Sequence, residues 1–182
     1  MQPAQGTLLI AGPFLKDPNF SRTVIFLCDY QEEGCFGFVV NRLYDHTLNE
    51  LLNDLDGVQL PVFYGGPVQM DTLHFLHQYP DLIPGSYEVL DGIYWGGDFE
   101  AAIALVKSGS IDTTKIRFYI GYSGWSSGQL DDELKEKSWL LTEATRGLVF
   151  HQPVAEIWKK ALKDMGGDYE MMANYPIDPS LN

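Results

Sequence analysis

The run Gly121-Tyr122-Ser123-Gly124-Trp125-Ser126-Ser127-Gly128-Gln129-Leu130 joins an apolar extended segment at residues 116–120 to the start of a helix. Three glycines lie in this connection. Glycine tolerates positive φ and lets another chain or a ligand approach the backbone closely. We therefore expect an unusual backbone conformation or a close backbone contact here. The run is therefore the best indication of a site in the chain.

Working outward from this run, hydrophobic periodicity predicts clustered strands and a few helices. Strands are predicted at Thr7–Ala11, 23–28, 35–40, Pro61–Tyr64, 73–77, 86–90, Ile93–Trp95, 116–122 and 139–141. Helices are predicted after Thr47 (through Leu48, Leu51, Leu52 and Leu55), at 99–107, at 129–137 and from Pro153 to 165. Strands outnumber helices and do not alternate with them, which favours an α+β fold with a mixed sheet.

The chain has 182 residues, with 12 Lys and Arg against 25 Asp and Glu, so its formal net charge is −13. This length suits a single domain, placed at residues 1–174, followed by a loose polar tail at 175–182. A protein surface with this excess of negative charge repels nucleic-acid phosphates and anionic lipids. Direct nucleic-acid binding and membrane association are therefore disfavoured, and DNA binding would need a local basic patch.

The start of the chain has no basic region, and the apolar residues 8–11 are too few for a signal peptide. Cys28 and Cys35 are too few for a disulfide scaffold, although a predicted hairpin places them where a bridge is conceivable. We expect a cytoplasmic protein with reduced thiols.

Five phrases, taken in order, resemble the bacterial AlgH/YqgE family. They are Gly6-Thr7-Leu8-Leu9-Ile10-Ala11, Asp17-Pro18-Asn19-Phe20-Ser21-Arg22-Thr23-Val24, Gly37-Phe38-Val39-Val40-Asn41-Arg42, Gly65-Gly66-Pro67-Val68 and the run at 121–130. The resemblance implies a single α+β domain whose strongly bent mixed sheet forms a partial barrel with flanking helices. Some members carry the label of transcriptional regulator, from effects on exopolysaccharide production. The family implies no catalytic activity, cofactor or catalytic residue for this chain.

Residues 124–128 also match the G-x-S-x-G pattern of a nucleophile elbow, with Asp131 or Asp132 and then His151 following in triad order. Both acids fall in the first turn of the predicted helix, where they favour its dipole. They would also oppose an anion held by the amides of this turn. A hydrolase using Ser126 and His151 is therefore the alternative hypothesis. The simpler interpretation is that Ser126 caps the helix.

We expect a cleft for a ligand or partner where residues 121–128 meet a second glycine-rich strand exit, Gly65-Gly66-Pro67. Arg22 is a polar candidate because arginine recognises anions in bidentate fashion, although pairing with Asp17 is its simpler role. Asn41 is another, although capping a strand end is the simpler role. The complete set of predicted cleft residues is Arg22, Asn41, Gly65, Gly66, Gly121, Gly124, Trp125, Gly128 and Gln129.

No metal or cofactor is expected. His74 and His77 would face opposite sides of a strand, and no third ligand follows at metal spacing. Two glycine-rich strand exits without a complete catalytic set favour a non-enzymatic regulatory or binding protein in the cytosol. Its partner would be an unidentified protein or small ligand.

Overall fold

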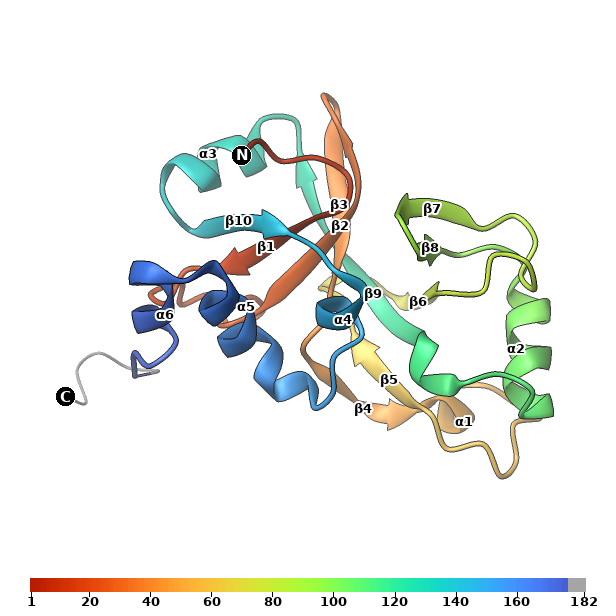
Figure 1. Cartoon of the computed structure of the whole chain (residues 1–182). Coiled ribbons are helices and arrows are strands. Elements are labelled where there is room, and N and C mark those ends of the chain that lie inside the picture. Colours follow the sequence, from red (N-terminus) through yellow and green to blue (C-terminus); the bar gives the residue numbers. More distant parts are fainter. Residues whose placement is uncertain (177–182) are drawn as a thin grey trace.

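One bent sheet organises residues 1–176, the part of the chain that this computed structural model describes (Figure 1). Its strands are β1 (Thr7–Ala11), β2 (Val24–Gln31), β3 (Gly34–Val39), β4 (Leu43–Thr47), β5 (Pro61–Tyr64), β6 (Val68–His77), β7 (Tyr87–Leu90), β8 (Ile93–Trp95), β9 (Ile116–Ser126) and β10 (Trp139–Glu143). The α-helices are α1 (Leu48–Leu51), α2 (Phe99–Ser108), α3 (Gln129–Lys135), α4 (Arg146–Val149), α5 (Ile157–Met165) and α6 (Gly167–Met172). Two 3₁₀ turns, Thr113–Lys115 and Val154–Glu156, precede β9 and α5.

The strands pair in the order β10-β1-β2-β3-β9-β6-β8-β7, and β5 pairs with both β4 and β9. The β5–β9 pair is parallel, whereas the neighbours along the main order are antiparallel. The predicted α+β domain, with a strongly bent mixed sheet and flanking helices, is therefore confirmed as a curled half-barrel.

Strand β9 joins the two halves of the sheet. Its first residues lie between β5 and β6, and its last four pair with β3, where Trp125 lies opposite Cys35. Gly121, with φ +67°, lies at the irregularity in the β6–β9 pairing, between Ile120 and Tyr122, just before the residues that pair with β3. The sequence predicted a strand ending at Tyr122 followed by a glycine-rich loop, and this was wrong. Glycine lets the chain bend here and remain in the ladder, so the strand continues to Ser126.

Strands β1 and β2 are buried on both faces. Leu8 and Phe26 face one hydrophobic cluster, which α4 and α5 cover, whereas Leu9 and Ile25 face another, which α3 covers. Strands of this kind read as continuous apolar runs rather than as alternating ones. A third cluster, under α1 and α2, packs on β5, β6 and the first half of β9.

The last long helix packs as its apolar stripe predicts, with Trp158 and Leu162 buried. The Trp158 indole N–H donates to the carbonyl of Ala11 at 2.9 Å, which ties α5 to the end of β1. Burying a side chain such as Leu162 contributes about 1.5–3 kcal/mol. Pro153 was predicted as the first helical residue, but the helix begins at Ile157, after a 3₁₀ turn.

The short elements differ most from prediction. Helix α1 ends at Leu51, because Leu52 is already extended, and Leu55 lies beyond it. The Thr47 hydroxyl bonds the side chains of Asn49 and Glu50 and does not cap the backbone. Strand β4 and helices α4 and α6 were not predicted. In β4 most side chains are exposed, so no apolar alternation marks the strand.

The predicted loose tail is described only at its start. The Tyr175 ring lies 5.7 Å from that of Phe14, and the Tyr175 carbonyl accepts a hydrogen bond from Arg22. Residues 177–182 lie outside the described part of the chain.

Candidate functional site

The two glycine-rich segments meet at the bend of β9, in direct backbone contact. A Cβ placed on Gly65 would lie 2.4 Å from the carbonyl oxygen of Gly121, and one on Gly66 would lie 2.2 Å from that of Tyr122. The Gly65 amide donates to the carbonyl of Ile120 at 2.8 Å. No side chain fits here, so these glycines permit two backbone segments of the chain to cross in direct contact. The adjacency considered from sequence exists, but backbone atoms occupy the space.

Arg22 and Asn41 lie together beside the start of β2, where they secure the backbone. The Asn41 side chain accepts the first N–H of β2 at 2.9 Å and donates to the carbonyl of Arg22 at 2.8 Å. The Arg22 guanidinium lies 4.6 Å from the ring centroid of Trp158. Among the described residues it forms no ion pair with Asp17, because it turns toward α5 instead. Both residues therefore serve the fold.

Ser126 and His151 lie far apart. Ser126 ends β9, and its hydroxyl lies 3.3 Å from the Gln129 side-chain oxygen. The carbonyl of His151 accepts a hydrogen bond from Arg117, near the other end of β9, and its ring lies 3.3 Å from a carboxylate oxygen of Glu156. Nine positions along a strand span roughly 20–30 Å. The geometry does not support the hydrolase alternative.

Gly128 and Gln129 form the start of α3. Gly128, with φ +77°, is the N-cap and makes no side-chain capping bond, so the prediction that Ser126 caps the helix was wrong. The side-chain oxygen of Gln129 instead accepts the Ser126 N–H at 3.1 Å. Gly128 lines a pocket of about 350 Å³ together with Tyr30 and Asp131. The Asp131 carboxylate opposes anion binding there.

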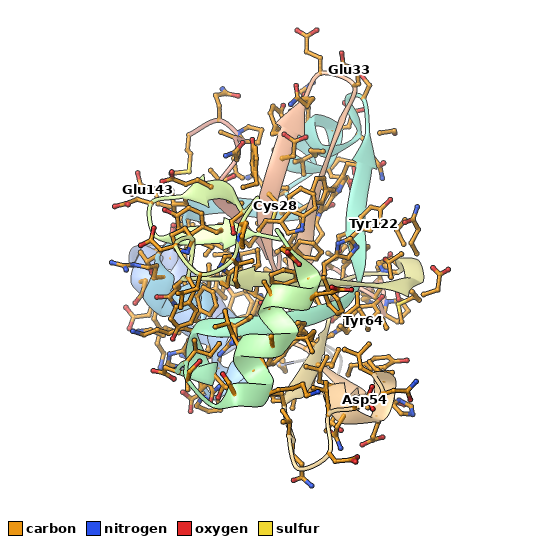
Figure 2. All side chains as sticks on the ribbon, turned by 90° about the vertical axis from the view of Figure 1, so that its right-hand side faces the viewer. Cys28, Glu33, Asp54, Tyr64, Tyr122 and Glu143 are labelled. Carbon is orange, nitrogen blue, oxygen red and sulfur yellow. The ribbon has the colours of Figure 1, made fainter. Side chains whose placement is uncertain are left out.

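A larger pocket, of about 540 Å³, lies on the other side of the β2–β3 hairpin. Residues of the hairpin and the last part of β9 line one side of the pocket, and residues of β6 and β8 line the other. Figure 1 shows where these strands lie in the sheet. In Figure 2, Glu33 marks the tip of the hairpin, and Tyr122 lies lower down on β9. Gly124 and Trp125, two of the predicted cleft residues, line this pocket.

Four aromatic rings of the lining form a closed circuit of contacts, in which each ring contacts two of the others. Phe36 lies 5.0 Å from Trp95 and 5.9 Å from Tyr122, measured between ring centroids. His74 completes the circuit at 6.4 Å from Trp95 and 6.0 Å from Tyr122. Each of the four rings is partly exposed. The site is therefore an aromatic pocket, a name used below for the cavity lined by these four rings.

The histidine of the aromatic pocket is uncharged near neutral pH, because burial lowers the pKa of His74. The Thr72 hydroxyl donates to the carbonyl of Gln69 at 2.7 Å, and lies 3.1 Å from His74 Nε2. Since its proton is committed to the carbonyl, the hydroxyl accepts from Nε2–H, which assigns the tautomer. The ring is thus a neutral wall of the pocket.

Asp29 and Cys35 complete the polar part of the lining. Asp29 lies directly opposite Phe36 in the β2–β3 pair. Burial, together with the negative charges of Asp131, Asp29 and Glu133, raises the pKa of Cys35 to about 11. Its thiol is therefore protonated at neutral pH, a poor state for a nucleophile or a metal ligand.

A bridge between the two cysteines is excluded by the faces on which they lie. Cys28 is buried in the cluster under α4 and α5, and Cys35 packs on the cluster under α3. Both thiols are free. The hairpin position suggested by the sequence was right, but the β-bulge between Leu27 and Asp29 changes the pairing register along the hairpin.

His77 lies on the opposite face of β6 from His74, as a strand requires, and stacks on Phe75 at 5.5 Å. Within residues 1–176, no group of three or more His, Cys, Asp or Glu is arranged to hold a metal ion.

None of the helices in this part of the chain has the length and apolar character that a membrane crossing needs.

None of the four rings is in the predicted cleft set. His74 was considered as a metal ligand, whereas Phe36, Trp95 and Tyr122 were not singled out. Each lies on a predicted strand, where an aromatic residue is an ordinary core choice. Tyr122 belongs to the glycine-rich run that marked the site, but only its neighbours were selected. The available signal was that Phe36 and Tyr122 lie next to glycine-bearing strand segments, where neighbouring glycines leave a ring uncovered.

The sequence profile of the AlgH-like family matches residues 8–170. A relative named UPF0301 protein from Chlorobium limicola is 40% identical over 177 residues, covering 97% of this chain and 95% of its own. A protein of the same name from Chlorobium luteolum is 42% identical over 179 residues, with coverage of 98% and 95%.

Two solved structures share the fold. The solution structure of the AlgH protein from Pseudomonas aeruginosa has a TM-score of 0.74 and 28% identity, covering 97% of this chain and 98% of that one. A crystal structure of a Corynebacterium diphtheriae protein has a TM-score of 0.80 at 17% identity, covering 96% and 94%.

Proposed function

The chain belongs to the AlgH-like family, and we propose that it is a non-enzymatic binding protein. Its binding site would be the aromatic pocket. The observation that carries this proposal is the closed circuit of four partly exposed rings around a cavity of about 540 Å³. Cavities of about 300–1,000 Å³ with mainly aromatic walls are typical of small-molecule sites.

Exposed aromatic surface favours an occupant energetically. Each square ångström of apolar surface removed from water contributes about 25 cal/mol, so covering part of several rings supports measurable affinity. The polar groups of the pocket do not form a catalytic set, since the Cys35 pKa is raised to about 11 and His74 hydrogen-bonds a hydroxyl that is itself committed to a carbonyl. Binding without chemistry fits these groups best.

The regulatory part of the proposal is indirect. A net charge of −13 opposes DNA binding, so an effect on transcription would pass through the bound ligand or a protein partner. The free thiols of Cys28 and Cys35 are compatible with the reducing cytoplasm, which we propose as its location.

The test compares ligand occupancy in two variants. Native mass spectrometry of the isolated protein detects a stoichiometric adduct, and titration with indole, followed by NMR, probes an empty pocket. Trp95→Ala should abolish the adduct or the indole-induced shifts. Tyr169→Ala removes an exposed aromatic from α6, outside the pocket, and should leave them unchanged. Equal binding by a folded Trp95→Ala variant would refute the site.

A further inference from the structure

The aromatic pocket exposes ring surface from four side chains to one cavity. Phe36 and Tyr122 meet edge to face at 76° with centroids 5.9 Å apart, and His74 and Tyr122 meet at 86° with centroids 6.0 Å apart. The cavity of about 540 Å³ lies beside these packed rings, each of which is partly exposed. A compact cation in this cavity would lie within about 6 Å of a ring centroid, the distance at which ring faces attract it.

The charge of the lining has one sign. Asp29 is the one charged side chain among the described residues that line the pocket, and neither Lys nor Arg is present there. The Asp29 carboxylate accepts one side-chain hydrogen bond, from Gln31 at 3.1 Å, and no ion pair involving it is formed within residues 1–176. Because Asp29 lies directly opposite Phe36 in the β2–β3 pair, its carboxylate lies on the same face of the hairpin as the Phe36 ring.

A third observation concerns the histidine. Burial lowers the pKa of His74, so near neutral pH this ring adds no positive charge to the walls. An anion would meet the Asp29 carboxylate and the negative faces of the rings, with no cation to hold it. A neutral ligand would gain apolar contact alone.

We infer that the aromatic pocket takes an organic cation, a quaternary ammonium or protonated alkylamine, held by ring faces and the Asp29 carboxylate. This inference rests on the proposed function, because it assigns a ligand class to the same site. Ring faces attract a cation through their quadrupole, and the alkyl groups of an alkylammonium also bury apolar surface of the pocket. Electrostatic attraction and apolar burial therefore both favour binding. The overall charge of −13 raises the local concentration of cations around the protein.

The test uses choline and its neutral carbon isostere, 3,3-dimethylbutan-1-ol, titrated by NMR or calorimetry. Choline should bind at least about tenfold more tightly than the isostere, since the two share shape and differ in charge. Asp29→Asn should weaken choline about fivefold or more and leave the isostere unchanged. Glu33→Gln removes an equal charge from the exposed hairpin tip, outside the lining, and should have little effect at 0.15 M salt.

The outcomes separate the two proposals. Equal affinity for choline and the isostere, or an Asp29→Asn variant that behaves like Glu33→Gln, overturns the cation inference and leaves the pocket as a binding site. Failure of choline, isostere and indole alike overturns the proposed function as well. A blocked peptide that contains trimethyl-lysine distinguishes the source. Tighter binding than choline assigns the cation to a protein partner, and weaker binding assigns it to a small molecule.

Discussion

A Cβ placed on Gly121 would lie 2.3 Å from the carbonyl oxygen of Gly66. This contact joins the end of β5 to the bend of β9, where the two halves of the sheet meet. The obstacle is a backbone atom held by the sheet, which cannot move aside as the end of a flexible side chain can. The bend therefore depends on a glycine at position 121 for space as well as for its φ of +67°.

Gly121→Ala should cost about 3 kcal/mol or more of unfolding free energy, or prevent folding, because steric overlap adds to the left-handed conformation. Gly128→Ala is the matched control. It has a similar φ of +77° but no atom within 4 Å of the added carbon. Only the conformational term of about 1–2 kcal/mol applies to it. Urea unfolding of both variants measures the difference, and equal losses would contradict the steric account.

Arg117→Met should destabilise the protein by about 3 kcal/mol. The buried guanidinium donates to the carbonyls of Val149, Phe150 and His151 at 3.2, 2.8 and 2.8 Å, and so satisfies the end of α4. Removing it leaves buried carbonyls without donors, at about 1 kcal/mol or more each. Arg117→Lys should fare little better, because a single ammonium does not reproduce the planar fork.

Arg42→Met is the control for that substitution. Arg42 also makes three hydrogen bonds to carbonyls, each at 2.8 Å, but at a partly exposed site where water can replace it. We expect a loss of about 1 kcal/mol. Thermal and urea unfolding of the pair would show whether burial decides the cost, and a larger loss for Arg42→Met would contradict this.

Acid should destabilise the fold through His77. Its Nδ1 accepts the N–H of Tyr79 at 3.1 Å, and its Nε2 lies 2.9 Å from the carbonyl of Gly96, so the buried ring is neutral. Burial lowers the pKa of His77 below the ordinary 6.5. Below about pH 6.5 the unfolded chain therefore binds more protons than the native one. Stability is retained above this pH and is lost as pH falls toward the folded pKa.

Unfolding free energies of His77→Gln at pH 7, 6 and 5 test this account. The variant should be about 1–3 kcal/mol less stable at pH 7 and should show a flatter pH dependence than the wild type. His46→Gln, which removes an exposed histidine of β4, is the control for loss of an imidazole elsewhere in the fold. If His77→Gln kept the wild-type slope, another group would be responsible.

Cys35 should alkylate slowly. With a pKa of about 11 rather than 9, its thiolate fraction at pH 8 is reduced about a hundredfold, and its rate with iodoacetamide falls by about tenfold or more, because a more basic thiolate is also more nucleophilic. The rate should rise with pH up to about 11. Asp131→Asn should accelerate the reaction, because the Asp131 charge helps to raise the pKa. Cys28→Ser should not change it, since Cys28 is buried on the other face, and a fast reaction at pH 8 would refute the assigned environment.

Local sequence was enough for the strands whose bounds depend on short-range patterns. Thr7–Ala11, Pro61–Tyr64 and Ile93–Trp95 were predicted with the bounds that the structure shows, because β-branched and aromatic runs end at glycine or at polar turns. The cap of α2 is equally local, since the Asp98 carboxylate accepts the N–H of Ala101 at 3.1 Å.

The candidate site could be located only in part. The glycine-rich run lies on β9, one of the strands that line the aromatic pocket, and Gly124 and Trp125 are among the lining residues. Gly65, Gly66 and Gly121 support a backbone crossing instead, because a glycine pattern looks the same whether a ligand or another chain occupies the space.

The strand-rich α+β class, the acidic composition and the glycines that allow β9 to bend all follow from the sequence. The continuation of β9 through those glycines, and the cavity that Phe36, Trp95 and Tyr122 line with His74, depend on the tertiary structure. These rings come from β3, β8, β9 and β6, so their meeting depends on strand order and register. Pairing between segments far apart in the chain sets both, and no local pattern of residues records it.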